Sequence, residues 1–118
     1  MIVHNVRERL HVRDGLPRIG RGDDVAVMVF SEFGRRVAEN ANLGTDHGTA
    51  GVAFVAGHKV RGGHYGAMPS LTDLDDGNLR FTTDFRRLYA SMITEWMRQP
   101  DAKPVLKGDF APLGLISA

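Results

Sequence analysis

Two short apolar runs along the chain have the pattern of buried β-strands. They cover residues 25–30 and 52–56, and both are continuous and rich in β-branched side chains. This pattern is typical of a strand that is covered on both faces. A polar turn that contains Gly34 follows the first run at residues 31–36, and open α/β sheets bind their ligands at such strand ends. We therefore predict a sheet with a ligand site just after Phe30.

The clearest helix is predicted over about residues 84–98. Its apolar positions recur at spacings of three and four and form one stripe, made of Phe85, Leu88, Tyr89, Met92 and Trp96. Thr83 is placed to cap the first turn, Asp84 suits the positive end of the helix dipole, and Pro100 ends the helix. An aromatic stripe of this kind can line a pocket, but we interpret it as core packing against the sheet.

Glycine and proline divide the rest of the chain. The glycine-rich segment 57–66 predicts a hairpin or a wide loop, because glycine readily adopts positive φ. The sequence at 75–78, Asp-Asp-Gly-Asn, is typical of a hairpin turn, with a brief strand after it at 79–81. Residues 39–45 predict a loop. Glycine and proline interrupt the apolar tail 104–118, which predicts a segment that wraps the surface.

Residues 1–22 differ from the rest of the chain and predict a basic N-terminal arm or linker. They contain five arginines against one glutamate and one aspartate. A weak apolar face predicts a marginal helix over about residues 2–12, and Gly15 and Pro17 interrupt any longer one. Residues 23–118 form the predicted folded domain.

Composition then narrows the function classes. A chain of 118 residues with 42% hydrophobic and 25% charged residues is an ordinary globular domain. The absence of cysteine excludes disulfides, thiolate metal sites and cysteine nucleophiles. A net charge of +1 argues against a nucleic-acid partner, and no apolar run is long enough for a membrane span. Met1 is not followed by a signal-peptide pattern, so the location of the protein is unknown.

One constellation of residues could carry chemistry: Glu32, Asp46 and His47, with Arg35 nearby. Carboxylate oxygens and imidazole nitrogens are the metal ligands that remain when thiolates are absent, so a divalent ion (zinc, calcium or magnesium) could bind there. The planar guanidinium of Arg35 suits the oxygens of a phosphate or sulfate ester. The alternative is an aspartate that accepts local backbone hydrogen bonds, a surface glutamate and a structural histidine.

His58 and His64 offer a second, weaker option. They flank a glycine loop, whose two arms could bring the imidazoles together. With His47 they would define a small metal hydrolase. Exposed loop histidines without a metal are the alternative. No P-loop, dinucleotide-binding, zinc-protease or nucleophile-elbow motif is present.

Several motifs in order resemble one bacterial family. They are VMVFSEFGRR at 27–36, GTDHG at 44–48, LTDLDDG at 71–77 and TTDF at 82–85. They are similar to the sulfatase-like domain-of-unknown-function family numbered 1501, in the alkaline phosphatase superfamily, over about residues 20–113. The resemblance implies a mixed α/β sheet flanked by helices on both faces, with a metal-centred site at strand ends. It also implies that the full-length protein is exported or periplasmic.

The resemblance covers only the C-terminal part of that family. Superfamily members place a metal-binding aspartate and a serine or threonine nucleophile on early strands, and those blocks are missing here. Related phosphatases and sulfatases have Asp-His where this chain has Glu32 and Phe33, whereas His47 matches a later metal-binding histidine. Arg35 belongs to the family motif.

We therefore expect an incomplete C-terminal part of a sulfatase-like protein. The family activity would be metal-dependent hydrolysis of a phosphate or sulfate ester, and this chain alone would be inactive, with no catalytic residue assigned. The alternative is a non-catalytic binding module, or a subunit that completes a partner chain or self-associates through an exposed sheet edge. A degenerate fragment would instead be poorly soluble, because a strand such as 25–30 would be uncovered.

Overall fold

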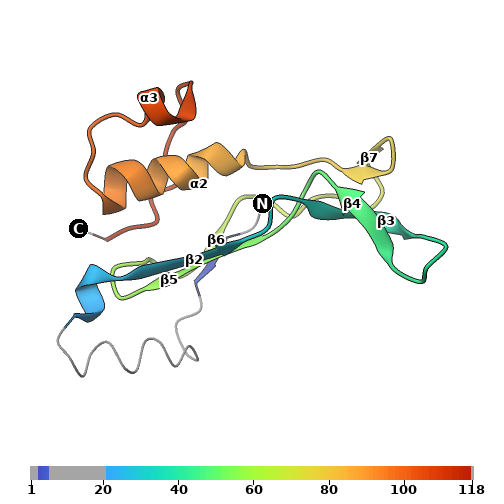
Figure 1. Ribbon diagram of the computed structural model, residues 1–118, viewed down its shortest axis with the longest axis horizontal. Helices are drawn as coiled ribbons and strands as arrows, with labels where there is room; N and C mark the ends of the chain where they lie inside the picture. Colours follow the sequence, from blue (N-terminus) through green and yellow to red (C-terminus); the bar gives the residue numbers. More distant parts are fainter. Residues whose placement is uncertain (1–2, 6–20, 118) are drawn as a thin grey trace.

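The chain folds into a mixed α/β structure, as the sequence predicts. The computed structural model describes residues 3–5 and 21–117. Its largest sheet has the strand order β2-β5-β1-β6, with bounds β2 Ala26–Phe30, β5 Ala53–Gly57, β1 Val3–Asn5 and β6 His64–Tyr65. Strand β1 runs parallel to β5, whereas β2 and β6 run antiparallel to their neighbours. In the described part of the chain, helices α2 (Phe85–Ser91) and α3 (Lys103–Leu106) lie on the same side of this sheet (Figure 1), rather than on both sides.

Both predicted apolar strands are present, but only one is well buried. In β5, Ala53 and Val55 are almost fully buried. In β2, by contrast, Val29 and Phe30 are each 54% exposed. Strand β2 is one of the two edge strands of the described sheet and pairs there only with β5. The prediction that β2 is covered on both faces is therefore wrong at its C-terminal end, where the neighbouring elements leave a hollow.

The segment after β2 is a hairpin, and the loop predicted over 39–45 is its connection, at residues 40–44. Strand β3 (Gly34–Glu39) pairs antiparallel with β4 (Thr45–Gly48), and the register places Arg35 opposite His47. Asn40 organises the connection, because its side-chain oxygen accepts hydrogen bonds from the amides of Asn42 and Gly44 at 3.0 and 3.2 Å. Most side chains of β3 are exposed, so no apolar alternation announces the strand in the sequence.

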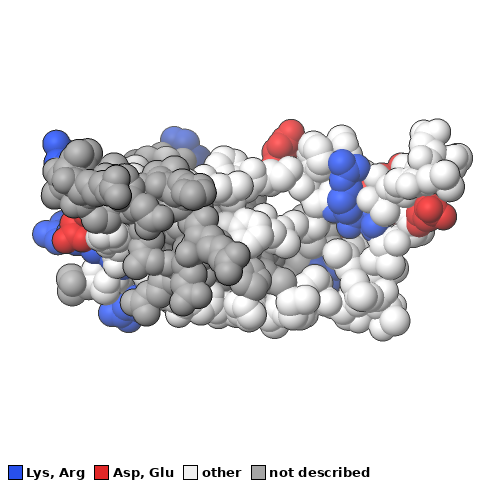
Figure 2. All heavy atoms as spheres, turned by 90° about the horizontal axis from the view of Figure 1, so that it is seen from below, with Lys and Arg blue, Asp and Glu red and all other residues white. Residues whose placement is uncertain are grey.

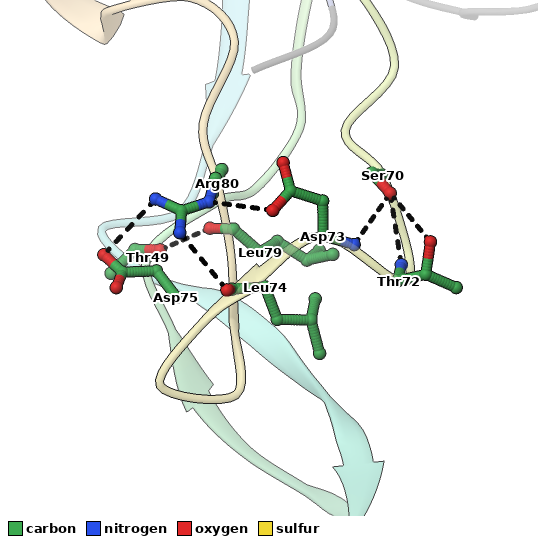
Figure 3. Close-up of polar contacts among 8 residues, drawn as sticks. All are labelled: Thr49, Ser70, Thr72, Asp73, Leu74, Asp75, Leu79 and Arg80. Atoms are coloured by element: carbon green, nitrogen blue, oxygen red, sulfur yellow. Dashed lines mark hydrogen bonds and ion pairs between the residues drawn. The ribbon is translucent and has the colours of Figure 1, made fainter.

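The second hairpin, β7 (Leu74–Asp75) and β8 (Asn78–Leu79), confirms the turn predicted at 75–78. Asp76 and Gly77 both have positive φ, 47° and 76°, which is the conformation of a type I′ turn. Arg80 donates to the Asp73 carboxylate at 3.2 Å (Figure 3). The Thr49 hydroxyl donates to the Leu79 carbonyl at 2.7 Å, so the hairpin is attached to the segment that precedes β5.

The predicted helix is present as α2 (Phe85–Ser91), which continues into a π-helical turn, η2 (Met92–Trp96). Its N-cap is Asp84, not Thr83, because the Asp84 carboxylate accepts the amide of Arg86 at 2.9 Å. Core packing holds for Leu88, which is 1% exposed. It does not hold for Phe85, which is 56% exposed.

The tail completes the core instead of wrapping the surface. It begins with a short helix, α3 (Lys103–Leu106), and Leu115 is fully buried further on. Leu115 joins the buried cluster of Ala53, Val55, Val60 and Leu88. The Glu95 carboxylate holds this segment, since its two oxygens accept the amides of Gly114 and Ile116 at 2.8 and 3.0 Å.

The N-terminal prediction is partly wrong. Residues Val3–Asn5 form a strand, whereas the apolar pattern predicts a marginal helix over about 2–12. Pairing with β5 on one side and β6 on the other satisfies the backbone N–H and C=O groups of this segment. A short helix is costly to nucleate, so the extended form is favoured. The remainder of the predicted basic arm, at 6–20, lies outside the described residues. A 3₁₀ turn, η1 (Gly22–Asp24), leads into β2.

The molecule is flat and elongated, with extents of 50 × 34 × 20 Å. Its radius of gyration is 16.3 Å, against about 13.5 Å for a compact domain of this length. On the face in Figure 2, the described charged residues are spread along the molecule with uncharged surface between them. Within the described chain, no helix is both long enough and apolar enough to cross a membrane.

Candidate functional site

A cavity of about 520 Å³ lies at the C-terminal end of β2, where the sequence predicts a ligand site. Three segments that are distant in sequence form its wall. They are the end of β2 with the start of β3, the connection into β5, and the start of α2 with the residues before it. The residues that line the cavity are Phe30, Ser31, Glu32, Phe33, Gly34, Thr49, Ala50, Gly51, Val52, Ala53, Phe81, Thr83, Asp84, Phe85, Arg86, Leu88 and Tyr89.

Aromatic side chains make up much of this wall. The ring of Tyr89 meets the edge of Phe30 at a centroid distance of 6.0 Å and that of Phe85 at 5.6 Å, both at 85°. Edge-to-face pairs of this kind are favourable. Phe30, Phe81 and Phe85 are nevertheless between 54% and 61% exposed. The apolar stripe of the helix therefore packs in two places. Leu88 lies in the core, and the rings of Phe85 and Tyr89 line the cavity.

Asp84 and Arg86 form a closely bound ion pair on the same wall. The Arg86 guanidinium donates to both carboxylate oxygens of Asp84, at 2.9 and 2.6 Å. This hydrogen bond from Arg86 lowers the pKa of Asp84 below its ordinary value, although partial burial opposes the shift. The guanidinium also lies over the Phe110 ring, 4.2 Å from its centroid. The two charges of the pair compensate each other at the cavity.

Glu32 and Thr83 are the other polar residues of interest on the wall. Glu32 is exposed at the end of β2 and forms no ion pair or hydrogen bond with the described part of the chain. Thr83 is only 6% exposed, and its hydroxyl makes no hydrogen bond to any residue among 3–5 and 21–117. A buried hydroxyl without a partner is unfavourable, so a bound molecule could supply the missing hydrogen bond.

The predicted metal ligands do not converge. Asp46 and His47 are neighbours on β4, so their side chains point to opposite faces of the hairpin. Asp46 accepts a hydrogen bond from the side-chain amide of Asn40 at 3.0 Å. His47 stacks on Phe33, with ring centroids 3.6 Å apart, while Glu32 lies on the cavity wall. Over residues 21–117, no three histidine or acidic side chains form a group that could hold a metal ion.

The side chain of Arg35, the predicted anion-binding residue, forms its hydrogen bond within the β3–β4 hairpin. Its Nη1 donates to the carbonyl of Thr45 at 2.8 Å, and its guanidinium lies 5.4 Å from the centroid of Phe33. It does not line the cavity. Of the two further histidines, His58 has its Nδ1 3.4 Å from a carboxylate oxygen of Asp23, and His64 begins β6.

The Asp84–Arg86 pair makes stability depend on pH in a defined direction. The pKa of Asp84 is lower in the folded chain, so the stabilisation is fully present above the pKa of an unfolded aspartate, about 3.9. It is lost as the pH falls through the lower folded value. Asp84→Asn, which keeps a good N-cap, should lose this acid dependence and little else, whereas Asp84→Ala should also lose the cap, at about 1 kcal/mol. Urea unfolding between pH 2 and 7 measures both, and an unchanged pH profile in Asp84→Asn would contradict the assignment.

Comparison with known proteins gives one match. The model of a family described as "protein of unknown function (DUF1501)" matches residues 12–107. No curated protein matches the chain. No solved structure matches it either.

Proposed function

The chain belongs to the DUF1501 family, whose function is unknown, and we propose that it supplies a binding pocket within a sulfatase-like protein and does not supply catalytic groups. The observation that carries this proposal is the open cavity at the end of β2. Apolar side chains make up most of its wall, and Asp46 and His47 do not join Glu32 there. The described chain thus offers a place to bind a molecule but no group of ligands for a metal.

The chemistry of ester hydrolysis supports the same division. Hydrolases of the alkaline phosphatase superfamily, which the sequence resembles, need an activated nucleophile and metal ions that neutralise charge on the transferred group. Ser31 lies on the cavity wall, but no described histidine or carboxylate is hydrogen-bonded to it as a general base. Catalysis therefore requires residues that the described chain does not bring to this cavity.

The packing of the chain supports the proposal that another segment or another chain covers part of its surface. Among the described residues, the buried cluster has five members, whereas many large apolar side chains are exposed. Those nearest the cavity are Phe30, Val52, Phe81 and Phe85. Exposed apolar patches of this kind mark surfaces that another segment or chain covers. A further segment packed here would close the cavity, and catalytic groups would come from outside the described residues.

The test is an assay for hydrolysis by the purified chain. We expect no turnover of an aryl phosphate or an aryl sulfate above the buffer rate, with zinc, magnesium or calcium added. Circular dichroism and a cooperative unfolding transition must show that the assayed protein is folded. Metal-dependent turnover that is lost on His47→Ala would overturn the proposal, because it would place a working metal site on the hairpin.

A further inference from the structure

The charge of the cavity wall does not match an anionic ester. Three charged residues line it, and two of them, Asp84 and Arg86, neutralise each other through two short hydrogen bonds. Glu32 is then the only lining charge without a partner in the described part of the chain. Arg35 does not line the cavity, because its guanidinium donates to the carbonyl of Thr45 and lies 5.4 Å from the centroid of Phe33. The wall therefore carries a net negative charge.

The aromatic residues of the wall favour the same sign of ligand. The cavity is lined by five aromatic side chains, Phe30, Phe33, Phe81, Phe85 and Tyr89. The face of an aromatic ring is electronegative and attracts ammonium groups. In this molecule, guanidinium groups already lie over two of these rings, that of Arg35 over Phe33 and that of Arg86 over Phe85 at 5.8 Å. Rings of this kind beside a single carboxylate make a suitable environment for an organic cation.

We propose that this cavity binds an organic cation, a protonated amine with an apolar body. The ammonium group lies against the aromatic wall and pairs with Glu32, and one of its N–H groups donates to the hydroxyl of Thr83. The apolar body fills the rest of the cavity, whose volume of about 520 Å³ is in the usual range for small-molecule sites. This inference concerns binding alone and does not depend on whether the family hydrolyses esters.

The experiment measures binding of four small molecules to the full chain by titration calorimetry or ligand-observed NMR. They are benzylammonium, benzyltrimethylammonium, benzyl alcohol and phenyl phosphate, which share one ring and differ in charge and in N–H groups. We expect both cations to bind at least about tenfold more tightly than benzyl alcohol. Phenyl phosphate should bind most weakly, because Glu32 repels it.

Variants then separate the two contacts. Glu32→Gln should weaken both cations about fivefold or more and leave benzyl alcohol unchanged. Glu39→Gln is the matched control, because Glu39 is an exposed glutamate of β3 that does not line the cavity. Thr83→Val keeps the shape of the side chain and should weaken benzylammonium but not benzyltrimethylammonium, which has no N–H to donate.

Three results would overturn the proposal. The first is phenyl phosphate binding as tightly as benzylammonium. The second is equal weakening by Glu32→Gln and Glu39→Gln, which would indicate attraction to the overall charge of the molecule. The third is cation binding that survives Phe85→Leu and Glu32→Gln together, provided that thermal unfolding shows the variant to be folded. None of these outcomes requires turnover, so failure here is distinguishable from failure of the proposed function.

Discussion

Leu115→Ala is expected to destabilise the chain by about 3 kcal/mol, the usual cost of truncating a fully buried leucine. Small domains have a free energy of unfolding of only about 5–15 kcal/mol, so this loss is a large share of the total. The buried cluster has five members in the described part of the chain, and the cavity left by the mutation would adjoin Val60 and Leu88. The measurement is the urea midpoint of unfolding.

Leu43→Ala is the matched control for this variant. Leu43 is 85% exposed in the loop between β3 and β4, so its truncation should change the free energy of unfolding by less than about 0.5 kcal/mol. Equal midpoints for the two variants would show that the tail does not pack into the core. A selective loss in Leu115→Ala would confirm that residues after α3 are part of the folded unit.

Gly34→Ala is the second change with a large expected effect. A Cβ at Gly34 would overlap the backbone carbonyl of Ala50, and a backbone carbonyl, unlike a flexible side chain, cannot move aside cheaply. We expect a cost of about 3 kcal/mol or more. Gly34 and Ala50 both line the cavity, so their separation would also deform it. Affinity for benzylammonium should fall together with stability.

Gly44→Ala tests the steric explanation. A Cβ at Gly44 would meet only the side-chain oxygen of Asn40, at an ordinary distance of 3.8 Å. This variant should therefore keep both the stability and the binding of the parent chain. If Gly34→Ala were equally harmless, the close approach of β3 to the segment before β5 would be wrong.

The elements predicted best are those whose pattern is local. Continuous β-branched runs identify β2 and β5, and the Asp-Gly pair identifies the turn of the β7–β8 hairpin because the type I′ geometry needs positive φ at both positions. The sequence does not predict the β3–β4 hairpin, because the hairpin is largely solvated and its strands lack the apolar alternation of a half-buried strand. The burial of Leu115 is not predictable from its local sequence, because it depends on contacts with distant residues. One example is the Glu95 carboxylate, which accepts a hydrogen bond from the amide of Gly114.

The sequence predicts where the candidate site lies but not most of the residues that line it. The strand-end rule places the site after Phe30, and Glu32 does lie on the cavity wall. Three of the five aromatic residues of the wall, Phe81, Phe85 and Tyr89, come from about fifty residues later, and only the folded chain brings them together with β2. Helical spacing indicates that Phe85 and Leu88 belong to one stripe, but it does not tell which ring faces a core and which faces solvent.

The uncharged sequence of β2 has a consequence for how the protein behaves in concentrated solution. Ala26–Phe30 has five apolar residues, no proline and no charge, and it is an edge strand of the described sheet. Such segments are prone to pair with copies of themselves and to form cross-β aggregates. Acidic residues flank the strand on both sides, Asp23 and Asp24 before it and Glu32 after it. Charges in these positions act as gatekeepers, because stacking identical strands would bring like charges together.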